Sequence, residues 1–210
     1  YEGISKLLPG SLLSVSRHQP EPRIWAYWSV SKVAKSGIAN AFSGSDQQAV
    51  DKLEALLKDA VCKQMMADVP LGAFLSGGVD SSLIVALMQA QSTKPVKTFT
   101  IGFNEESYNE AVHAKAVAKH LGTDHTELYV TAEQAQSVIP LLATMYDEPF
   151  SDSSQIPTFL VSQLARQNVT VALSGDAGDE LFCGYNRYQM TENLWRKVAT
   201  VPMPLRKLLA

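Results

Sequence analysis

The segment FLSGGVDSS at positions 74–82 combines groups that could hold a phosphate-bearing ligand. Its two glycines, Gly77 and Gly78, let backbone amides approach an anion closely. The segment lies between an apolar run and a predicted helix, whose free amides and partial positive charge point at the loop. It therefore predicts an anion-binding loop, and the alternative is a strand-to-helix turn capped by Asp80 or Ser81. Three hydroxyl groups can contribute to anion binding, those of Ser76, Ser81 and Ser82.

The same loop has no lysine at its end, unlike loops that finish in Gly-Lys-Ser or Gly-Lys-Thr and bind the outer phosphates of a nucleotide. Its sequence therefore disfavours transfer of the terminal phosphate. A carboxylate next to phosphates requires a divalent cation between them, and Mg²⁺ commonly binds one or two carboxylates together with phosphate oxygens. We predict that Asp80 is the first Mg²⁺ ligand.

A second candidate segment, ALSGDAGDELFCGY at 172–185, follows the last predicted strand. Asp176, Asp179 and Glu180 lie close together in it, and their charges repel one another unless a cation or solvent intervenes. Solvated turns also carry such acids, so this segment by itself leaves both interpretations open. Because neighbouring parallel strands end at one edge of a sheet, its pairing with Asp80 favours a metal and nucleotide site.

A third segment, YDEPFSDSSQIPTF at 146–159, combines acids, serines and two prolines. Pro149 restricts Glu148 to extended geometry, and Ser153 or Ser154 could cap the next helix. A turn between two helices and a substrate-binding loop are both compatible with this pattern.

The elements around these segments predict an α/β fold. A helical apolar period runs from Asp46 to about residue 65, and we expect Pro70 to end that helix. Apolar runs then alternate with helical segments, and strands that are apolar throughout are typical of a parallel sheet covered on both faces. We therefore predict a doubly wound, mostly parallel, Rossmann-like sheet. The expected strands are 71–76, 96–103, 125–130 and 169–175, and the expected helices are 80–90, 108–121, 132–146 and 155–167.

The composition of the 210 residues fits a globular domain with an attached segment, since 46% of them are hydrophobic. Residues 1–45 have the content of a linker or of the end of another unit. A net charge of −3 without a basic face argues against a nucleic-acid partner. No apolar run reaches the roughly 20 residues of a membrane span, and the N-terminus has no signal-peptide pattern. We expect a cytoplasmic protein in which Cys62 and Cys183 are reduced thiols.

Four segments in order resemble the synthetase domain of glutamine-dependent asparagine synthetases, which belong to the pyrophosphate-loop ATP pyrophosphatase superfamily. SGGVDSS alone is similar to the whole superfamily, whereas the longer segments and their spacing are similar to this branch. These segments are DVPLGAFLSGGVDSS, FTIGFNEESYNEAVHAKAVAKHLGTDH, DEPFSDSSQIPTFLVSQLAR and VALSGDAGDELFCGY. LLPGSLLSVSRHQPEPRIWAYW resembles the end of the family's glutaminase domain and its linker. The resemblance thus implies a glutaminase end and linker over 1–45 and an ATP-pyrophosphatase domain over 46–210.

The resemblance implies an adenine nucleotide alpha-hydrolase-like fold and a reaction in two steps. The side-chain carboxylate of aspartate attacks the α-phosphate of ATP and releases pyrophosphate, and ammonia from glutamine then displaces AMP. A loop that grips the leaving pyrophosphate stabilises charge where it develops. The implied cofactors are ATP and Mg²⁺. By motif position, pyrophosphate and Mg²⁺ are bound by Ser76, Gly77, Gly78, Asp80, Ser81 and Ser82, and the second metal ligand is Asp179. ATP is contacted by Leu75, Ile101, Ser174 and Gly175. The catalytic candidate beside the reacting groups is Asp176.

The chain departs from the family pattern in three respects. Residue 1 is Tyr where the family's glutaminase domain has a nucleophilic cysteine, so we expect this chain not to hydrolyse glutamine. Ala177 stands where this branch often has Gly. The family also uses a lysine well downstream of the acidic segment, and Lys197 and Lys207 lie too close to that segment for this role. We therefore expect a piece of a longer enzyme that binds Mg-ATP and turns over little.

The implied partners are aspartate, ATP, ammonia and the glutaminase domain of the same parent chain, with a homodimer left open. Neither nucleic acid nor a membrane is an expected partner. Two alternative functions also stay open. An enzyme on the same scaffold could act on another carboxylate, for example by amidating a sugar acid or closing a lactam. A nucleotide-binding module without catalysis is the second, although Asp80 and Asp179 are both present.

Overall fold

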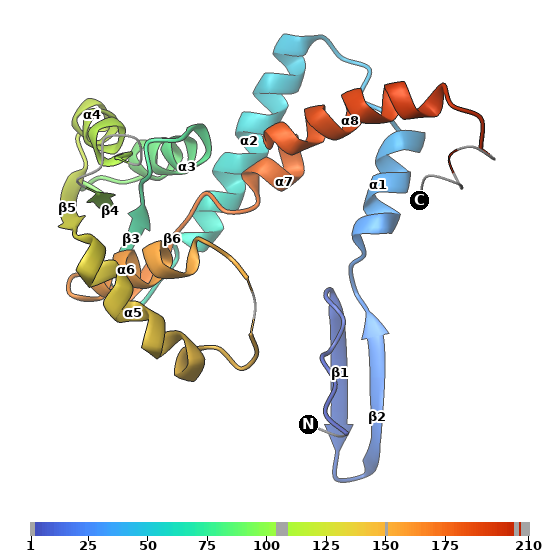
Figure 1. Cartoon of the computed structure of the whole chain (residues 1–210), viewed down its shortest axis with the longest axis horizontal. Coiled ribbons are helices and arrows are strands. Elements are labelled where there is room, and N and C mark those ends of the chain that lie inside the picture. The colour runs from blue at the N-terminus through green and yellow to red at the C-terminus, as the bar shows by residue number, and fades with distance from the viewer. Residues whose placement is uncertain (1–2, 104–108, 150, 204–205, 207–210) are drawn as a thin grey trace. The chain divides into compact units, whose positions relative to one another are not determined.

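The computed structural model describes residues 3–103, 109–149, 151–203 and 206 (Figure 1). The chain forms two compact units, Tyr1–Ala55 and Leu56–Ala210. In the first unit, two antiparallel strands form a hairpin, and a helix follows it. The elements here are β1 (Ser11–Ser16), β2 (Gln19–Ala26), α1 (Val30–Ala39) and the start of α2 (Asp46–Gln64).

The second unit contains a four-stranded parallel sheet in the order β5-β4-β3-β6. Its strands are β3 (Leu71–Phe74), β4 (Lys97–Phe103), β5 (Asp124–Val130) and β6 (Val171–Leu173). The helices between and after them are α3 (Val79–Ala90), α4 (Ala111–Leu121), α5 (Ala132–Met145), α6 (Gln155–Arg166), α7 (Gly178–Phe182) and α8 (Asn186–Ala199).

Helices cover both faces of this sheet, with α3 and α4 on one face and α5 and α6 on the other (Figure 1). On the first face, Ala73 and Leu75 pack with α3, α4 and the second half of α2. On the other face, Phe99 and the partly buried Phe74 pack against Leu164 of α6. Burial of apolar side chains on both faces explains why these strands are apolar along most of their length. The predicted doubly wound α/β fold is confirmed.

At β3 the direction in which successive strands are added to the parallel sheet changes. The chain passes from β3 to β4 and then to β5 on one side, and it later returns to place β6 on the other side of β3. In open parallel sheets such a switch point leaves a crevice at the carboxyl ends of the strands, where ligands bind. The loops that follow β3 and β6 flank this crevice, so the fold brings the glycine-rich loop and the second acidic segment together.

Most predicted elements begin and end within a few residues of the observed ones. The expectation that Pro70 ends α2 is wrong, because the helix ends at Gln64, where the Met65 amide is shared between two carbonyls and tightens the last turn. The helix expected from residue 108 begins at Ala111, and residues 104–108 lie outside the described part. The sequence analysis does not predict the hairpin, α1, α7 or α8. No helix in the described ranges is long and apolar enough to cross a bilayer.

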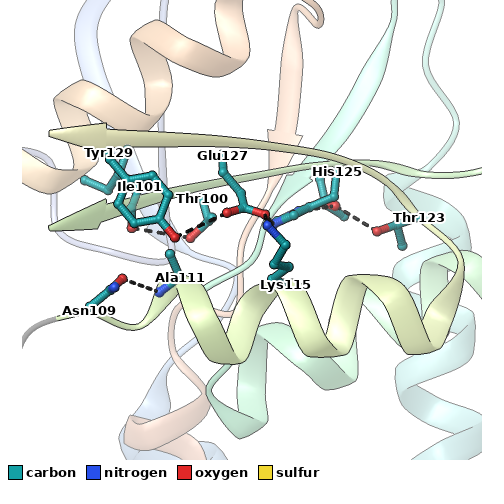
Figure 2. A network of polar contacts seen from close by, with 10 residues as sticks. Thr100, Ile101, Asn109, Ala111, Lys115, Thr123, His125, Glu127 and Tyr129 are labelled. Atoms are coloured by element: carbon teal, nitrogen blue, oxygen red, sulfur yellow. Dashed lines mark hydrogen bonds and ion pairs between the residues drawn. The ribbon is translucent and has the colours of Figure 1, made fainter. Parts of the chain in front are cut away.

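A polar network joins α4 to the edge strand β5 (Figure 2). The Lys115 ammonium on α4 lies 3.0 Å from Glu127 Oε1 on β5. His125 Nδ1 lies 2.9 Å from Thr98 Oγ1, which is itself 2.9 Å from Thr123 Oγ1. The hydrogen bond to Glu127 raises the pKa of Lys115, whereas burial lowers the pKa of His125. In this network the chain itself supplies a basic partner for Glu127.

Candidate functional site

Two serine side chains shape the loop after β3. Ser81 Oγ accepts a hydrogen bond of 3.2 Å from the Ser76 amide and lies 2.9 Å from Ser76 Oγ. The N-cap of α3 is Gly78, and no side chain makes a capping hydrogen bond there. Neither Asp80 nor Ser81 is therefore the cap of this helix, and that part of the alternative is wrong. The first amides of α3 remain able to bind an anion, which the helix dipole also attracts.

Gly77 and Ser82 belong to this loop without lining a cavity. Gly77 has a φ of 83°, and a Cβ there would lie 2.6 Å from the amide nitrogen of Ala114 in α4. Glycine meets both constraints because it has no Cβ. The Ser82 hydroxyl is buried and has no hydrogen-bond partner within the described part of the chain.

An acidic cavity of about 800 Å³ lies between the loops after β3 and β6 and the start of α6. No Lys or Arg occurs among its described lining residues. Like charges so close together repel one another unless cations neutralise them. This cavity therefore suits a ligand that brings its own cations. The carboxylates that line it belong to Asp80, Asp152, Asp176, Asp179 and Glu180.

The loop after β6 packs closely on the start of α3. A Cβ on Gly175 would lie 2.7 Å from the Ser81 amide nitrogen, and a Cβ on Gly178 would overlap the Asp80 carboxylate. These close approaches bring the second acidic segment beside Asp80. Between the two glycines, Ala177 has a φ of 73°, in the left-handed region that favours glycine. Backbone strain is thus present in the wall of the acidic cavity, at the position where the resembled family often has Gly.

Hydroxyl groups hold two of the acids in this wall. The Tyr185 hydroxyl donates a hydrogen bond of 2.9 Å to Glu180 Oε1, which raises the pKa of the tyrosine. The Ser174 hydroxyl donates one of 3.0 Å to Asp176 Oδ2. These donors are neutral, so they fix the orientation of the acids but leave their negative charge uncompensated.

The segment 146–159 lies between two helices and lines a cavity, and its predicted substrate-binding role stays a prediction. Ser154 is the N-cap of α6, but its side chain makes no capping hydrogen bond. Asp152 Oδ1 instead accepts a hydrogen bond of 2.8 Å from the Ser154 amide, and this lowers the pKa of Asp152. Asp152 and Ser154 also line the acidic cavity. The segment is therefore both a helix start and a cavity wall, and Phe150 within it lies outside the described residues.

A second cavity of about 660 Å³, here called the apolar cavity, adjoins the acidic cavity. Phe74, Ser76, Ser154 and Thr158 line both cavities. Cavities of this size commonly hold small-molecule ligands. A ligand with one apolar, planar part and one charged part fits across the two. The apolar walls are formed by Leu75, Phe99, Ile101, Phe103, Pro157 and Val161.

The two predicted metal ligands, Asp80 and Asp179, both line the acidic cavity. In the described ranges, no group of three His, Cys, Asp or Glu side chains is placed to hold a metal ion. Mg²⁺ bound by two carboxylates and by phosphate oxygens needs no such group. The carboxylates present, which lack basic partners in the cavity wall, therefore fit a cation that binds together with a nucleotide.

Every predicted site residue except Gly77 and Ser82 lines one of the two cavities. Their binding and catalytic roles stay predictions. Leu75 and Ile101 lie in the apolar cavity, and Ser76 lies in both. The acidic cavity contains Gly78, Asp80, Ser81, Ser174, Gly175, Asp176 and Asp179.

Several further lining residues are absent from the predicted site set, among them Phe74, Thr158 and Tyr185. Phe74 directly precedes the glycine-rich loop, and Thr158 follows Ser154 by four residues on one helix, so both positions carried a usable signal. The place of Tyr185 beside Glu180 depends on the turn after α7, in which Cys183 has a φ of 57°. No sequence pattern considered above predicts that turn.

The sequence profile of the asparagine synthase family matches residues 52–210. A provisionally named glutamine-hydrolysing asparagine synthetase of Mycobacterium tuberculosis is 38% identical over 207 residues, covering 99% of this chain and 31% of that protein. The glutamine-hydrolysing asparagine synthetase 1 of Bacillus subtilis is 36% identical over 165 residues, covering 78% of this chain and 26% of that protein. The chain thus spans about a third or less of the length of these curated relatives.

Among solved structures, an NH3-dependent NAD synthetase from Campylobacter jejuni aligns with a TM-score of 0.44 and 14% sequence identity. The alignment covers 65% of this chain and 60% of that chain. This likeness is too distant to add to the topology described above.

Proposed function

The chain belongs to the asparagine synthase family, and we propose that it forms the part of a ligase that activates a carboxylate with ATP and transfers it to ammonia. The activated group is the side-chain carboxylate of aspartate, and the product is asparagine. The observation that carries this function is the pair of adjoining cavities at the topological switch point. The apolar cavity suits the adenosine part of ATP, and the acidic cavity beside the uncapped helix start suits its phosphates with their cation.

The loop after β3 acts on the leaving group. The first amides of α3 and the hydroxyl of Ser76, which lines the acidic cavity, bind the β- and γ-phosphates, where they stabilise the charge that develops as pyrophosphate departs. An oxygen of the aspartate side chain forms the new bond to the α-phosphorus, and the bond between that phosphorus and the bridging oxygen breaks. No lysine for terminal-phosphate transfer is needed, in agreement with the loop sequence.

The second step joins ammonia to the activated carbonyl carbon. The nitrogen forms the amide bond, AMP leaves with one oxygen of the original carboxylate, and a proton is released. Asp176 lines the acidic cavity in the loop after β6, and we assign this acid to the proton transfer. The Ser174 hydroxyl holds Asp176 Oδ2 at 3.0 Å and so orients it.

Asp80 and Asp179 are the residues that would hold Mg²⁺, which when bound offsets the charge of the triphosphate. Both acids line the acidic cavity, and its described walls supply no basic residue in their place. These two carboxylates therefore serve to bring the nucleotide into a cavity that would otherwise repel it.

Ammonia is the nitrogen donor that this part of the enzyme uses, and a glutaminase domain of the same parent protein supplies it from glutamine. We assign residues 1–45 to the end of that domain and its linker, and residues 46–210 to the synthetase domain. The separate compact unit Tyr1–Ala55 and the family match from residue 52 support this division.

The direct test is an analysis of nucleotide products from the full-length protein that contains this sequence. It is incubated with ATP, Mg²⁺, aspartate and ammonium chloride, and compared with Asp80→Ala. We expect AMP and pyrophosphate to form only when aspartate is present, and the variant to release neither.

Other outcomes distinguish the alternatives. Formation of ADP and phosphate would show that the assigned cleavage site is wrong. AMP release that requires a different carboxylate would keep the loop assignment and replace aspartate as the substrate. Binding of Mg-ATP without any carboxylate-dependent turnover would indicate a nucleotide-binding module.

A further inference from the structure

In the proposed reaction, one of the two carboxylates of the aspartate substrate has no binding partner assigned so far. A substrate with two carboxylates uses one of them to attack phosphorus, and the other must bind to the protein. Neither cavity has a Lys or Arg among its described lining residues, and five carboxylates line the acidic cavity. A basic residue next to the cavity wall would supply the opposite charge that these described lining residues do not offer to the second carboxylate.

Arg187, at the start of α8, is the cation that the structure places next to that wall. Its guanidinium carbon lies 4.1 Å from the centre of the Tyr185 ring and 5.9 Å from the centre of the Tyr188 ring. Tyr185 itself lines the acidic cavity. The guanidinium therefore lies next to a residue of the cavity wall.

The stacking leaves the hydrogen-bonding edge of Arg187 available. A guanidinium that lies over a ring uses its face for that contact, and its N–H donors point outward in the plane of the group. Within the described part of the chain, no carboxylate forms an ion pair with Arg187, whereas Arg196 on the same helix pairs with Glu192 at 2.6 Å. Arg187 is thus exposed, held in place and able to bind a carboxylate in a bidentate manner.

We propose that Arg187 binds the second carboxylate of the substrate, the one that is not activated, and that Tyr185 is its positioning residue. This inference rests on the proposed function and names the residue that makes the site select a dicarboxylic acid. Tyr185 acts through its ring, which supports the guanidinium, and its hydroxyl separately donates a hydrogen bond of 2.9 Å to Glu180.

The phosphates of the nucleotide are the other anion that an arginine could bind. The phosphates already have hydrogen-bond donors in the first amides of α3. The start of α3 and the loop after β6 line the same acidic cavity. Arg187 follows that loop and α7 in the chain. Because the phosphates have these donors without Arg187, we assign Arg187 to the carboxylic acid.

The test measures pyrophosphate release by the full-length protein while aspartate and Mg-ATP are varied in turn. For Arg187→Ala we expect the KM for aspartate to rise about 10- to 100-fold, as for the loss of a charge-assisted bidentate contact, with the KM for Mg-ATP within about twofold. Arg187→Lys keeps the charge and should recover part of the loss. Arg196→Ala is the matched control on the same helix, and it should change neither constant.

Two variants of Tyr185 test the positioning role. Tyr185→Phe keeps the ring and should leave the KM for aspartate within about threefold of the unaltered protein. Tyr185→Leu removes the ring and should raise this constant toward that of Arg187→Ala. A structural role alone would change kcat or thermal stability in both variants without this difference between Phe and Leu.

Each remaining result overturns the assignment. An unchanged KM for aspartate in Arg187→Ala contradicts it, and a rise confined to the KM for Mg-ATP assigns Arg187 to the phosphates instead. If the unaltered protein releases no AMP with any carboxylate, the proposed function fails as well, which separates that failure from a failure of Arg187 alone.

Discussion

Two groups of charged residues on the same sheet balance their charges in opposite ways. In the network between α4 and β5, the Glu127 side chain is only 16% exposed, and its Oε1 lies 3.0 Å from the Lys115 ammonium. At the switch point, five carboxylates line one cavity, and none of its described lining residues is basic. The first group has its counter-charge within the chain, whereas we propose that the second obtains its counter-charge from a ligand.

We interpret the uncompensated group as the functional one. A charge that has an opposite charge beside it in the folded protein can stabilise the fold. A charge without such a partner lowers the stability unless a bound ligand supplies the opposite charge. Strain follows the same division. Ala177 and Cys183, the non-glycine residues with positive φ in the described ranges, flank α7, and Ala177 lines the acidic cavity.

Among these substitutions, Asp80→Asn in the acidic cavity should have the largest effect on activity. Loss of a metal ligand should lower kcat/KM for Mg-ATP by at least about 100-fold, the range for removing one group that stabilises developing charge. The thermal midpoint Tm should rise slightly, because the substitution removes one of several repelling charges. Kinetics and thermal melts of the same preparation measure both quantities.

The matched control for this substitution is Asp59→Asn, since Asp59 is an exposed helical acid that pairs with Lys63 at 2.6 Å. It should leave the activity unchanged. A drop in Tm for Asp80→Asn in the absence of ligand would contradict the view that this acid is uncompensated in the folded chain.

Glu127→Gln should have the opposite effect on stability. The substitution removes the acceptor charge next to Lys115, so Tm should fall by roughly 2–5 °C, as for the loss of one charge-assisted hydrogen bond in a domain of this size. The KM for Mg-ATP should stay within about twofold. If Tm is unchanged, the network beneath α4 does not stabilise the fold and the contrast between the two groups is lost.

The pH dependence of stability provides a smaller effect. Burial lowers the pKa of His125 from its ordinary value of 6.5, and Glu127 opposes this shift. Between the folded and unfolded pKa values, His125 is therefore protonated in the unfolded chain and neutral in the folded chain. The stability due to neutral His125 is present above the unfolded pKa and is lost as pH falls through the folded pKa. Tm should therefore decrease on acidification below that ordinary value.

His125→Gln removes the titrating group and keeps a side chain that can reach Thr98 Oγ1, which lies 2.9 Å from His125 Nδ1. Its Tm should depend less on pH over this window than that of the unaltered protein. Equal slopes for the two proteins would show that other groups cause the acid sensitivity.

The sequence predicts the sheet, its main helices and the two loops at the switch point, because these depend on local period and on short motifs. The pairing of Asp80 with the acids after β6 follows from strand order alone. The apolar cavity was not predictable in the same way, since Phe74, Phe99 and Val161 meet there from two strands and a helix. Their shared wall depends on side-chain packing.

Other features depend on backbone details that no pattern specifies. Ala177 shows nothing in its side chain that predicts a φ of 73°. The contact between Tyr185 and Glu180 at 2.9 Å exists because the turn after α7 reverses the chain. The hairpin at residues 11–26 was missed because its segment carries the prolines and serines typical of a linker.

The most direct test of the account is the Mg²⁺ dependence of ATP binding, measured by titration calorimetry on the unaltered chain and on Asp80→Asn/Asp179→Asn. If the acidic cavity is completed by a ligand-borne cation, removing Mg²⁺ with EDTA should weaken ATP binding to the unaltered chain at least about tenfold. The double variant should show no such dependence. Equal affinity of the unaltered chain for ATP with and without Mg²⁺ would contradict the central claim.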